Sequence, residues 1–185
     1  MVSSLPPIRI PADGDDPNPG VMTKRPNVSA GLVLYRRTGG RLEIFLAHPG
    51  GPFWRNRDAG AWTIPKGVLN DGEDPLDAAR REFEEETGIK PTGPFLSLGA
   101  VRQRAGKLVH AWGWEGDADA STTTSNVMRT EWPRGCGEWL SFPEIDRCAW
   151  FPADTAREKM NAAQSELIGR LEAALVAPEN VRDGV

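Results

Sequence analysis

Cysteine and histidine are scarce in this chain of 185 residues, which contains two of each. Cys136 and Cys148 form no CxxC pair and lie beside no histidine cluster, so neither a disulfide framework nor a structural zinc site is expected. No stretch approaches the ~18 consecutive apolar residues of a membrane span. Pro6, Pro7 and Arg9 interrupt the start of the chain, where a signal peptide needs an apolar run. These absences predict a protein of the reducing cytoplasm with no membrane partner.

An excess of positive charge is also missing, since the formal net charge is -4. A protein that binds nucleic acid by broad neutralisation of phosphates needs a basic surface, so that function is not expected. A small phosphorylated substrate is compatible with an acidic chain, because bound cations can reverse the local charge. The hydrophobic fraction of 39% is enough for one ordinary globular core.

The composition divides the chain into three segments. Residues 1–27 are rich in proline, aspartate and glycine and are expected to form an extended arm with little core of its own. Residues 28–176 are expected to form one domain, because a chain of this length suits a single domain. Residues 177–185 are a short tail.

Short apolar runs predict a series of strands. Residues 29–35 form the first and residues 42–48 the second, with Leu42, Ile44 and Leu46 at a period of two, and a hairpin turn at residues 38–40 joins them. Further strands are expected at 62–64, 95–101, 107–114, 127–132 and 138–142.

Two helices are expected among these strands. The first begins after Asp74, which suits an N-cap and is followed by Pro75, and it ends at Thr87 before Gly88. The second is expected over residues 153–175. This order of elements predicts an α+β or layered α/β fold, with a mixed β-sheet sandwiched between helices.

Three carboxylates stand at i, i+3 and i+4 on the first helix, as Glu82, Glu85 and Glu86. Each like-charge pair on one helix face costs roughly 0.2–0.5 kcal/mol. A hard divalent cation such as Mg²⁺ prefers oxygen ligands and would turn this repulsion into coordination. The alternative is a solvated acidic face whose charge is offset by Arg80 and Arg81.

The residues around these glutamates favour the metal. Gly67 follows a strand, Glu73 ends the next loop, and Arg81 is placed to reach back to Glu73. The whole stretch reads Gly67-x5-Glu73-x7-Arg81-Glu82-Phe83-x-Glu85-Glu86-x-Gly88-Ile89. This pattern resembles the Nudix box in every fixed position, over residues 67–89.

The resemblance implies a divalent-metal-dependent hydrolase of phosphoanhydride bonds, with Mg²⁺ or Mn²⁺ as cofactor. It implies that the metal ligands are Glu82, Glu85, Glu86 and the main-chain carbonyl of Gly67, with Glu85 and Glu86 in the catalytic set. It also implies the mixed sheet between helices that the order of elements predicts.

The same resemblance implies structural roles for three more residues of the motif. Glu73 and Arg81 would orient the loop and the helix, and Phe83 would face the core. In this family a carboxylate outside the box often serves as general base. Glu131 and Glu138 are our candidates because they flank a loop before a late strand, with Glu115 a third choice. Each is otherwise an ordinary surface glutamate.

Substrate contacts are expected just before the box. The run of residues 65–67, Pro-Lys-Gly, looks like that of the diadenosine polyphosphate and RNA 5′-pyrophosphate branches of the family. Lys66 would then hold a phosphate as a point charge, or be an exposed loop lysine. Arg55 and Arg57 are further candidates for contacts with polyphosphate, in a loop beginning near His48 that could line the substrate cleft. His110 is expected to be a packed strand residue.

The function expected from the sequence is hydrolysis of a nucleoside or dinucleoside polyphosphate, a small-molecule partner. One alternative is a pyrophosphohydrolase of RNA 5′ ends or nucleotide sugars, in which case the RNA end would be the single nucleic-acid partner. Another is a Nudix-fold nucleotide-binding regulator without turnover. The intact set of glutamates argues against the regulator, because a pure binder could lose them freely.

Overall fold

The computed structural model describes residues 28–176, so the arm expected at 1–27 and the tail at 177–185 lie outside the described residues. The strands and helices follow one another along the chain in this order: β1 (Val28–Thr38), β2 (Arg41–Pro49), β3 (Lys66–Val68), α1 (Pro75–Thr87), β4 (Phe95–Arg102), η1 (Arg104–Gly106), β5 (Leu108–Glu115), η2 (Ala120–Thr122), β6 (Val127–Glu131), β7 (Trp139–Pro143), β8 (Ile145–Pro152), α2 (Ala153–Lys159) and α3 (Glu166–Val176). None of these helices is long and apolar enough to cross a membrane.

The main sheet has six strands and is mixed, as the sequence predicts. Its order is β4-β5-β1-β2-β8, and the short strand β3 pairs with the first part of β1. β1 and β5 run parallel, while the other neighbours are antiparallel. β1 therefore lies at the centre of the sheet and contacts three other strands.

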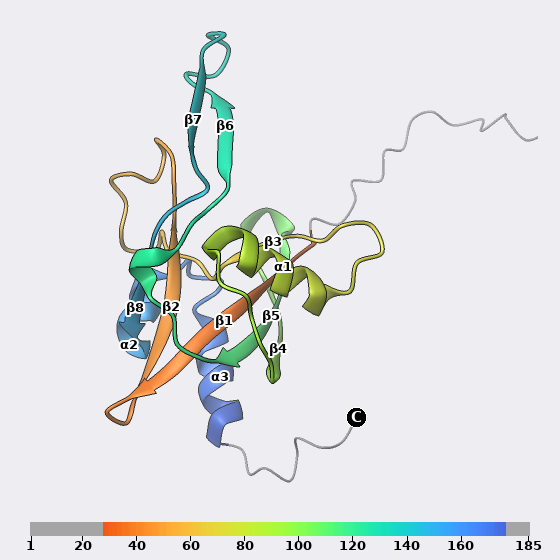
Figure 1. The fold of residues 1–185 in the computed structure, drawn as a ribbon, viewed down its shortest axis with the longest axis vertical. Coiled ribbons are helices and arrows are strands. Elements are labelled where there is room, and N and C mark those ends of the chain that lie inside the picture. Colours follow the sequence, from red (N-terminus) through yellow and green to blue (C-terminus); the bar gives the residue numbers. More distant parts are fainter. Residues whose placement is uncertain (1–27, 177–185) are drawn as a thin grey trace, which may run out of the picture.

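Alternation along β1 divides the core into two layers. Leu32 and Leu34 pack with Phe83 of α1, whereas Val33 and Tyr35 pack with residues of α2 and α3 such as Leu171. Successive side chains of a strand point to opposite faces, so each face of the sheet receives its own helices. Figure 1 shows the resulting arrangement, and the predicted sheet sandwiched between helices is confirmed.

The ends of α1 follow the predicted caps. The Asp74 side chain accepts hydrogen bonds from the main-chain N–H groups of Leu76 and Asp77, at 2.9 and 3.3 Å, and Pro75 opens the helix. Gly88 closes it with φ of 73°, a left-handed conformation that glycine adopts without strain. These local contacts fix where the acidic helix starts and stops.

β6 and β7 form a separate two-stranded hairpin that projects away from the main sheet (Figure 1). Its strands lie where the sequence predicts them, and Glu131 is paired with Trp139 near the tip. The base of the hairpin leads through Glu144 directly into β8.

The prediction of a strand at residues 62–64 is wrong in its extent. Trp62 and Thr63 form only isolated bridges, to Met160 and Ala47, and the regular strand that pairs with β1 is β3, at residues expected to be a loop. Pro65 has no N–H to donate, so the chain enters the ladder after it, at Lys66.

The sequence missed β8, which is the edge strand beside β2. Its burial follows no alternation of inward and outward side chains, because Asp146 and Arg147 are both exposed and Ala149, Trp150 and Phe151 are all partly buried. A strand without a period of two is invisible to pattern analysis.

The single helix expected over 153–175 is instead two helices, α2 and α3, separated by residues 160–165. Main-chain groups at this break form hydrogen bonds with Trp62, which is distant in the sequence. Trp62 N–H donates to Lys159 O, and Asn161 N–H donates to Trp62 O. Gln164 is fully buried there and accepts hydrogen bonds from Thr63 Oγ1 and Ile64 N–H. Contacts to a distant segment therefore override the helical spacing.

Candidate active site

Gly67 is the point where the acidic helix meets the sheet. β3 pairs antiparallel with β1, with Gly67 opposite Ala30, and α1 lies across both strands. The Glu82 carboxylate packs directly on Gly67, where a Cβ atom would overlap it. Glycine is therefore required at this position to admit the carboxylate. Burial raises the pKa of Glu82, although the ion pair with Arg81 opposes the effect.

Glu86 is the most buried carboxylate of the helix, with 5% of its surface exposed. Its Oε2 accepts a hydrogen bond from the main-chain N–H of Lys66, at 2.8 Å. Burial raises the pKa of Glu86 to about 8, and the Lys66 charge opposes the effect. The main-chain hydrogen bond from Lys66 also favours the anion, but burial outweighs both effects.

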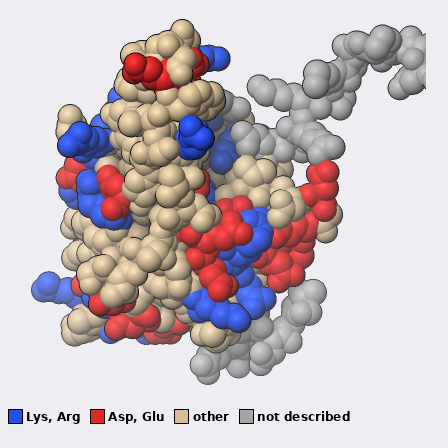
Figure 2. All heavy atoms as spheres, turned by 45° about the horizontal axis from the view of Figure 1, so that its top comes forward, with Lys and Arg blue, Asp and Glu red and all other residues tan. Residues whose placement is uncertain are grey.

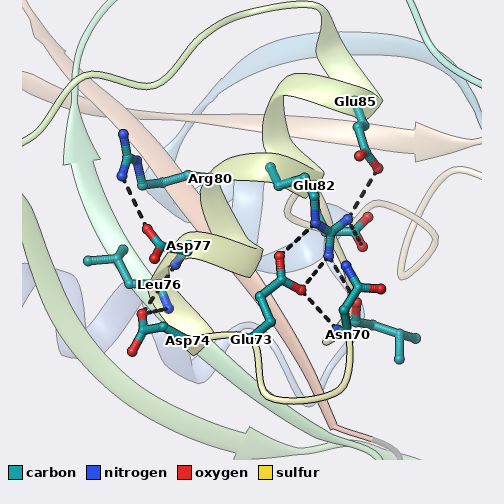
Figure 3. A network of polar contacts seen from close by, with 10 residues as sticks. Asn70, Glu73, Asp74, Leu76, Asp77, Arg80, Glu82 and Glu85 are labelled. Atoms are coloured by element: carbon teal, nitrogen blue, oxygen red, sulfur yellow. Dashed lines mark hydrogen bonds and ion pairs between the residues drawn. The ribbon is translucent and has the colours of Figure 1, made fainter.

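Arg81 braces the loop 69–74 against α1, as predicted. Its Nε and Nη2 atoms donate to the two oxygens of Glu73 at 2.7 and 2.9 Å, and Nη2 also donates to Val68 O at 3.2 Å. Figure 3 shows Glu73 of the loop and Glu82 and Glu85 of the helix turned toward this guanidinium. The Arg81 contact lowers the pKa of Glu73 to about 2.

The three glutamates do not converge on one point. Arg81 Nη1 donates to Glu82 at 2.7 Å and to Glu85 at 3.3 Å, while Glu86 faces β3. Within residues 28–176, no three His, Cys, Asp or Glu side chains are gathered as a ready ligand set. Glu85 is 43% exposed, and an exposed ion pair of this kind contributes about 0–1 kcal/mol, so a dication competes for its carboxylate at little cost.

The donor groups at this junction fit a hard divalent cation. They are all oxygens, from three carboxylates and the main chain at Gly67, which is the chemistry that Mg²⁺ and Mn²⁺ select. The raised pKa values of Glu82 and Glu86 also mark carboxylates that lack enough nearby positive charge. A bound dication would supply that charge and return both groups to the ionised form.

Two lysines act on these carboxylates, and the sequence points to one of them. Lys66 is half-buried and its charge acts on Glu86. Lys107 is the second cation, at a position where the sequence predicts the start of a strand. Burial lowers the pKa of Lys107, and Lys66 lowers it further, while Glu86 and Glu82 raise it.

Glu144 is a second residue that sequence reasoning missed. It lies between β7 and β8, half-buried, and its charge acts on Glu82, Glu86 and Lys107. Its backbone is held at both ends, since its N–H donates to Asn126 O and its carbonyl accepts from Gly50 N–H, each at 2.8 Å. In the sequence, Glu144 is marked only by its position after a predicted strand and Pro143. Its place in the fold becomes clear only when the strand that follows it, β8, is known.

The residues expected as general base lie elsewhere. Glu131 accepts a hydrogen bond from Gly137 N–H at 2.7 Å, which stabilises the tip of the β6–β7 hairpin and helps to lower its pKa. Glu138 lies in the same tip. Glu115 ends β5 at the opposite end from Lys107. Glu144 is instead a charge that acts on both Glu82 and Glu86.

The expected substrate loop is only partly exposed. Arg55 and Arg57 are exposed, and the Arg57 guanidinium lies over the Trp54 ring at 5.6 Å. His48 does not line an open cleft, because it is fully buried at the end of β2. His110 is half-buried in β5 and stacks on Trp112, as expected for a packed residue.

Charged side chains of both signs gather on the α1 side of the molecule, below the projecting hairpin (Figure 2). The fold and this junction together define an α/β sandwich protein with an acidic helix laid over a glycine-containing strand, beside two lysines. The family model described as "NUDIX domain" matches residues 25–171, which is most of the chain. The chain belongs to the Nudix family.

Curated relatives match mainly over short segments. The asymmetrical bis(5′-nucleosyl)-tetraphosphatase of Caenorhabditis elegans is 41% identical over 61 residues, which are 33% of this chain and 40% of that protein. An RNA pyrophosphohydrolase of Bartonella bacilliformis is 39% identical over 64 residues, 32% of this chain and 35% of that protein. The RNA pyrophosphohydrolase of Rhodospirillum rubrum is 29% identical over 147 residues, 72% of this chain and 82% of its own.

Solved structures share the fold. A C. elegans Ap4A hydrolase in a binary complex superposes with a TM-score of 0.55 at 23% identity, covering 80% of this chain and 96% of its own. The Nudix domain of Shewanella oneidensis NrtR, complexed with ADP ribose, gives a TM-score of 0.55 at 16% identity over 80% of this chain and 88% of its own.

The brace predicts a loss of stability when Arg81 is removed. We expect Arg81→Ala to lower the free energy of unfolding by about 1–3 kcal/mol, because Glu73 loses its charge-assisted hydrogen bonds. Arg80→Ala is the matched control, since its pair with Asp77 is exposed and is expected to change stability by less than about 1 kcal/mol. Denaturant unfolding measures both, and equal midpoints for the two variants would contradict the brace.

The same pair gives the brace a pH signature. The pKa of Glu73 is lowered to about 2 in the folded protein, so its contribution to stability is complete above the unfolded value of about 4.5 and is lost as the pH falls toward 2. The difference in stability between the wild type and Glu73→Gln is therefore expected to shrink over that range. A difference independent of pH would show that Glu73 acts by packing alone.

Proposed function

We propose that this chain hydrolyses a phosphoanhydride bond in a nucleoside polyphosphate, using a divalent cation. The observation that carries the proposal is the junction of α1 and β3. There the Glu82 carboxylate lies on Gly67, and the Glu86 carboxylate accepts a hydrogen bond from Lys66 N–H. The charges of Lys66 and Lys107 both interact with Glu86. This combination offers oxygen ligands for a cation and positive groups for a phosphate chain.

The residues that would hold the cation are Glu82, Glu85, Glu86 and the main-chain carbonyl of Gly67. When bound, Mg²⁺ or Mn²⁺ neutralises phosphate oxygens and lowers the pKa of a water molecule. Lys66 and Lys107 would hold further oxygens of the phosphate chain. Hydrolysis forms a bond from a water oxygen to phosphorus, and the bridging oxygen leaves with its electron pair as a phosphate.

A carboxylate must accept the proton of the attacking water. Glu131 and Glu138 are the candidates that the sequence offers, and we add Glu144. Its support is electrostatic, because Glu144 acts on Glu82, Glu86 and Lys107, whereas Glu131 is engaged at the hairpin tip. The fixed backbone of Glu144 would keep its carboxylate at one position relative to α1.

The preferred substrate is proposed from the residues that would contact its phosphate groups. An acidic protein gains little from long-range attraction to a polyphosphate, so it depends on local groups: the cation, Lys66, Lys107 and the exposed Arg55 and Arg57. A longer phosphate chain offers these groups more oxygens. Relatives named as a tetraphosphatase and as RNA pyrophosphohydrolases support a substrate with at least three phosphates, and a dinucleoside tetraphosphate is our first choice.

The metal ligands predict a large loss of turnover without a loss of folding. We expect Glu86→Gln and Glu85→Gln each to lower kcat by at least ~100-fold, the scale of losing a positioned electrostatic group. The thermal midpoint of the metal-free protein should stay close to that of the wild type, because Gln resembles the protonated form that burial favours at Glu86. Glu84→Gln is the matched control, since Glu84 is exposed on the same helix and should retain full activity.

The general base predicts a change in the pH dependence of kcat. Replacing the base with glutamine should leave metal binding intact and abolish the rise of kcat with pH that reports its deprotonation. We expect this result for Glu144→Gln and compare it with Glu131→Gln, Glu138→Gln and Glu115→Gln. A wild-type profile in Glu144→Gln together with a lost rise in one of the other variants would transfer the assignment to that residue.

A panel of substrates at fixed Mg²⁺ tests the function itself. We expect a higher kcat/KM for diadenosine tetraphosphate than for ATP, ADP-ribose or a nucleotide sugar, with ATP and AMP as products identified by mass. Labelled water would locate the attacked phosphorus. Lys66→Ala should weaken catalysis on the tetraphosphate more than on the shorter substrates.

The panel also decides between the branches. A preference of tenfold or more, about 1.4 kcal/mol, for a triphosphorylated RNA end or a nucleotide sugar would overturn the dinucleotide branch and leave the hydrolase chemistry standing. Tight nucleotide binding with no hydrolysis of any substrate would instead favour a regulator.

A further inference from the structure

His48 is a buried histidine with two polar partners on different segments. It ends the regular pairing of β2, at a register shift between His48 and Pro49, and none of its surface is exposed. Its Nδ1 lies 2.9 Å from Asp146 Oδ1 on β8, and its Nε2 lies 2.7 Å from the main-chain oxygen of Arg57. The ring therefore bridges the edge strand and the loop after β2.

Both partners of the ring can only accept hydrogen bonds. The carboxylate of Asp146 and the carbonyl of Arg57 carry no proton to donate, and a neutral imidazole has a single N–H. Each of the two bonds therefore needs a proton on the ring nitrogen that forms it.

The bond to Arg57 connects the loop 51–57 to the rest of the protein. The other main-chain hydrogen bonds of this loop are internal: Trp54 and Arg55 N–H groups donate to Gly51 O, and Arg57 N–H donates to Trp54 O. Within residues 28–176, the His48 contact is the one hydrogen bond that ties these seven residues to another element. The Phe53 ring, which meets Trp132 at 4.3 Å, adds an apolar contact.

The neighbouring corner at Glu144 does not depend on His48. Main-chain hydrogen bonds to Asn126 and Gly50 hold Glu144, and Ile145 N–H donates to Ser125 Oγ at 3.0 Å. Loss of the His48 bridge would therefore remove this hydrogen bond of the loop 51–57 and leave the main-chain hydrogen bonds of Glu144 intact. The two parts of the site can be separated by experiment.

We propose that His48 is a positioning residue that holds the loop 51–57 so that Arg55 and Arg57 meet the phosphate chain of the substrate. This inference rests on the proposed function, because it assigns those arginines to a polyphosphate. Through this bridge, His48 affects substrate binding and leaves the chemical step unchanged. The charged and ring groups around His48 are Asp146 and Arg147 of β8, Trp62 at 5.1 Å, and the ion pair of Asp58 with Lys159 next to Trp62.

Two conservative variants separate the two bonds. Asparagine places its amide nitrogen near the position of Nδ1, so His48→Asn retains the Asp146 contact and loses the Arg57 contact. Glutamine places its amide nitrogen near Nε2, so His48→Gln retains the Arg57 contact. We expect His48→Asn to raise KM for diadenosine tetraphosphate about tenfold, or about 1.4 kcal/mol, with kcat within about twofold of the wild type, and His48→Gln to restore most of the binding.

His110→Gln is the matched control, because His110 is the other histidine of the chain, and its KM should stay at the wild-type value. An unchanged KM in His48→Asn, or equal losses of kcat in both variants without rescue, would overturn the positioning role.

One measurement does not require turnover. Calorimetry with inorganic tripolyphosphate should show weaker binding to His48→Asn than to His48→Gln. Equal affinities would overturn the inference, whereas failure of the substrate panel alone would overturn only the proposed function.

Discussion

The burial of a carboxylate between a helix and a strand is the constraint on which this site depends. Glu86 is 5% exposed and is held by a main-chain N–H of β3, so α1 must lie close to the strand, and the strand must leave room for the carboxylates of the helix. Gly67 satisfies the second condition, because the carboxylate of Glu82 occupies the space of its missing side chain. The cost of burying these anions is offset only by positive charge nearby.

Arg81 explains how such an acidic helix remains folded without a cation. Its guanidinium bonds to Glu73, Glu82 and Glu85 at once, so one positive group neutralises part of the face and fixes the preceding loop. Glu86 is outside its reach and carries the strongly raised pKa. The site is therefore stable on the exposed side of α1 and short of positive charge on the buried side, where a dication would bind.

The remaining candidate residues come from segments that are distant in the sequence. Glu144 lies in the turn between β7 and β8, Lys107 precedes β5, and the arginines that we propose to bind phosphate lie in the loop 51–57 after β2. His48 and Gly50 connect two of these segments, through Asp146 and the Glu144 carbonyl. Such bridges explain how exposed arginines can be held by a scaffold whose rigid elements lie beneath them.

The sequence by itself determined the features that depend on near neighbours. The caps Asp74 and Gly88 and the Arg81–Glu73 pair involve groups a few residues apart, so local physics suffices. The extent of β3, the edge strand β8, the break between α2 and α3 and the placement of Glu144 were decided only by the tertiary structure. Their hydrogen bonds and charges join segments about 20 to 100 residues apart, and no local pattern encodes which distant backbone will supply a partner.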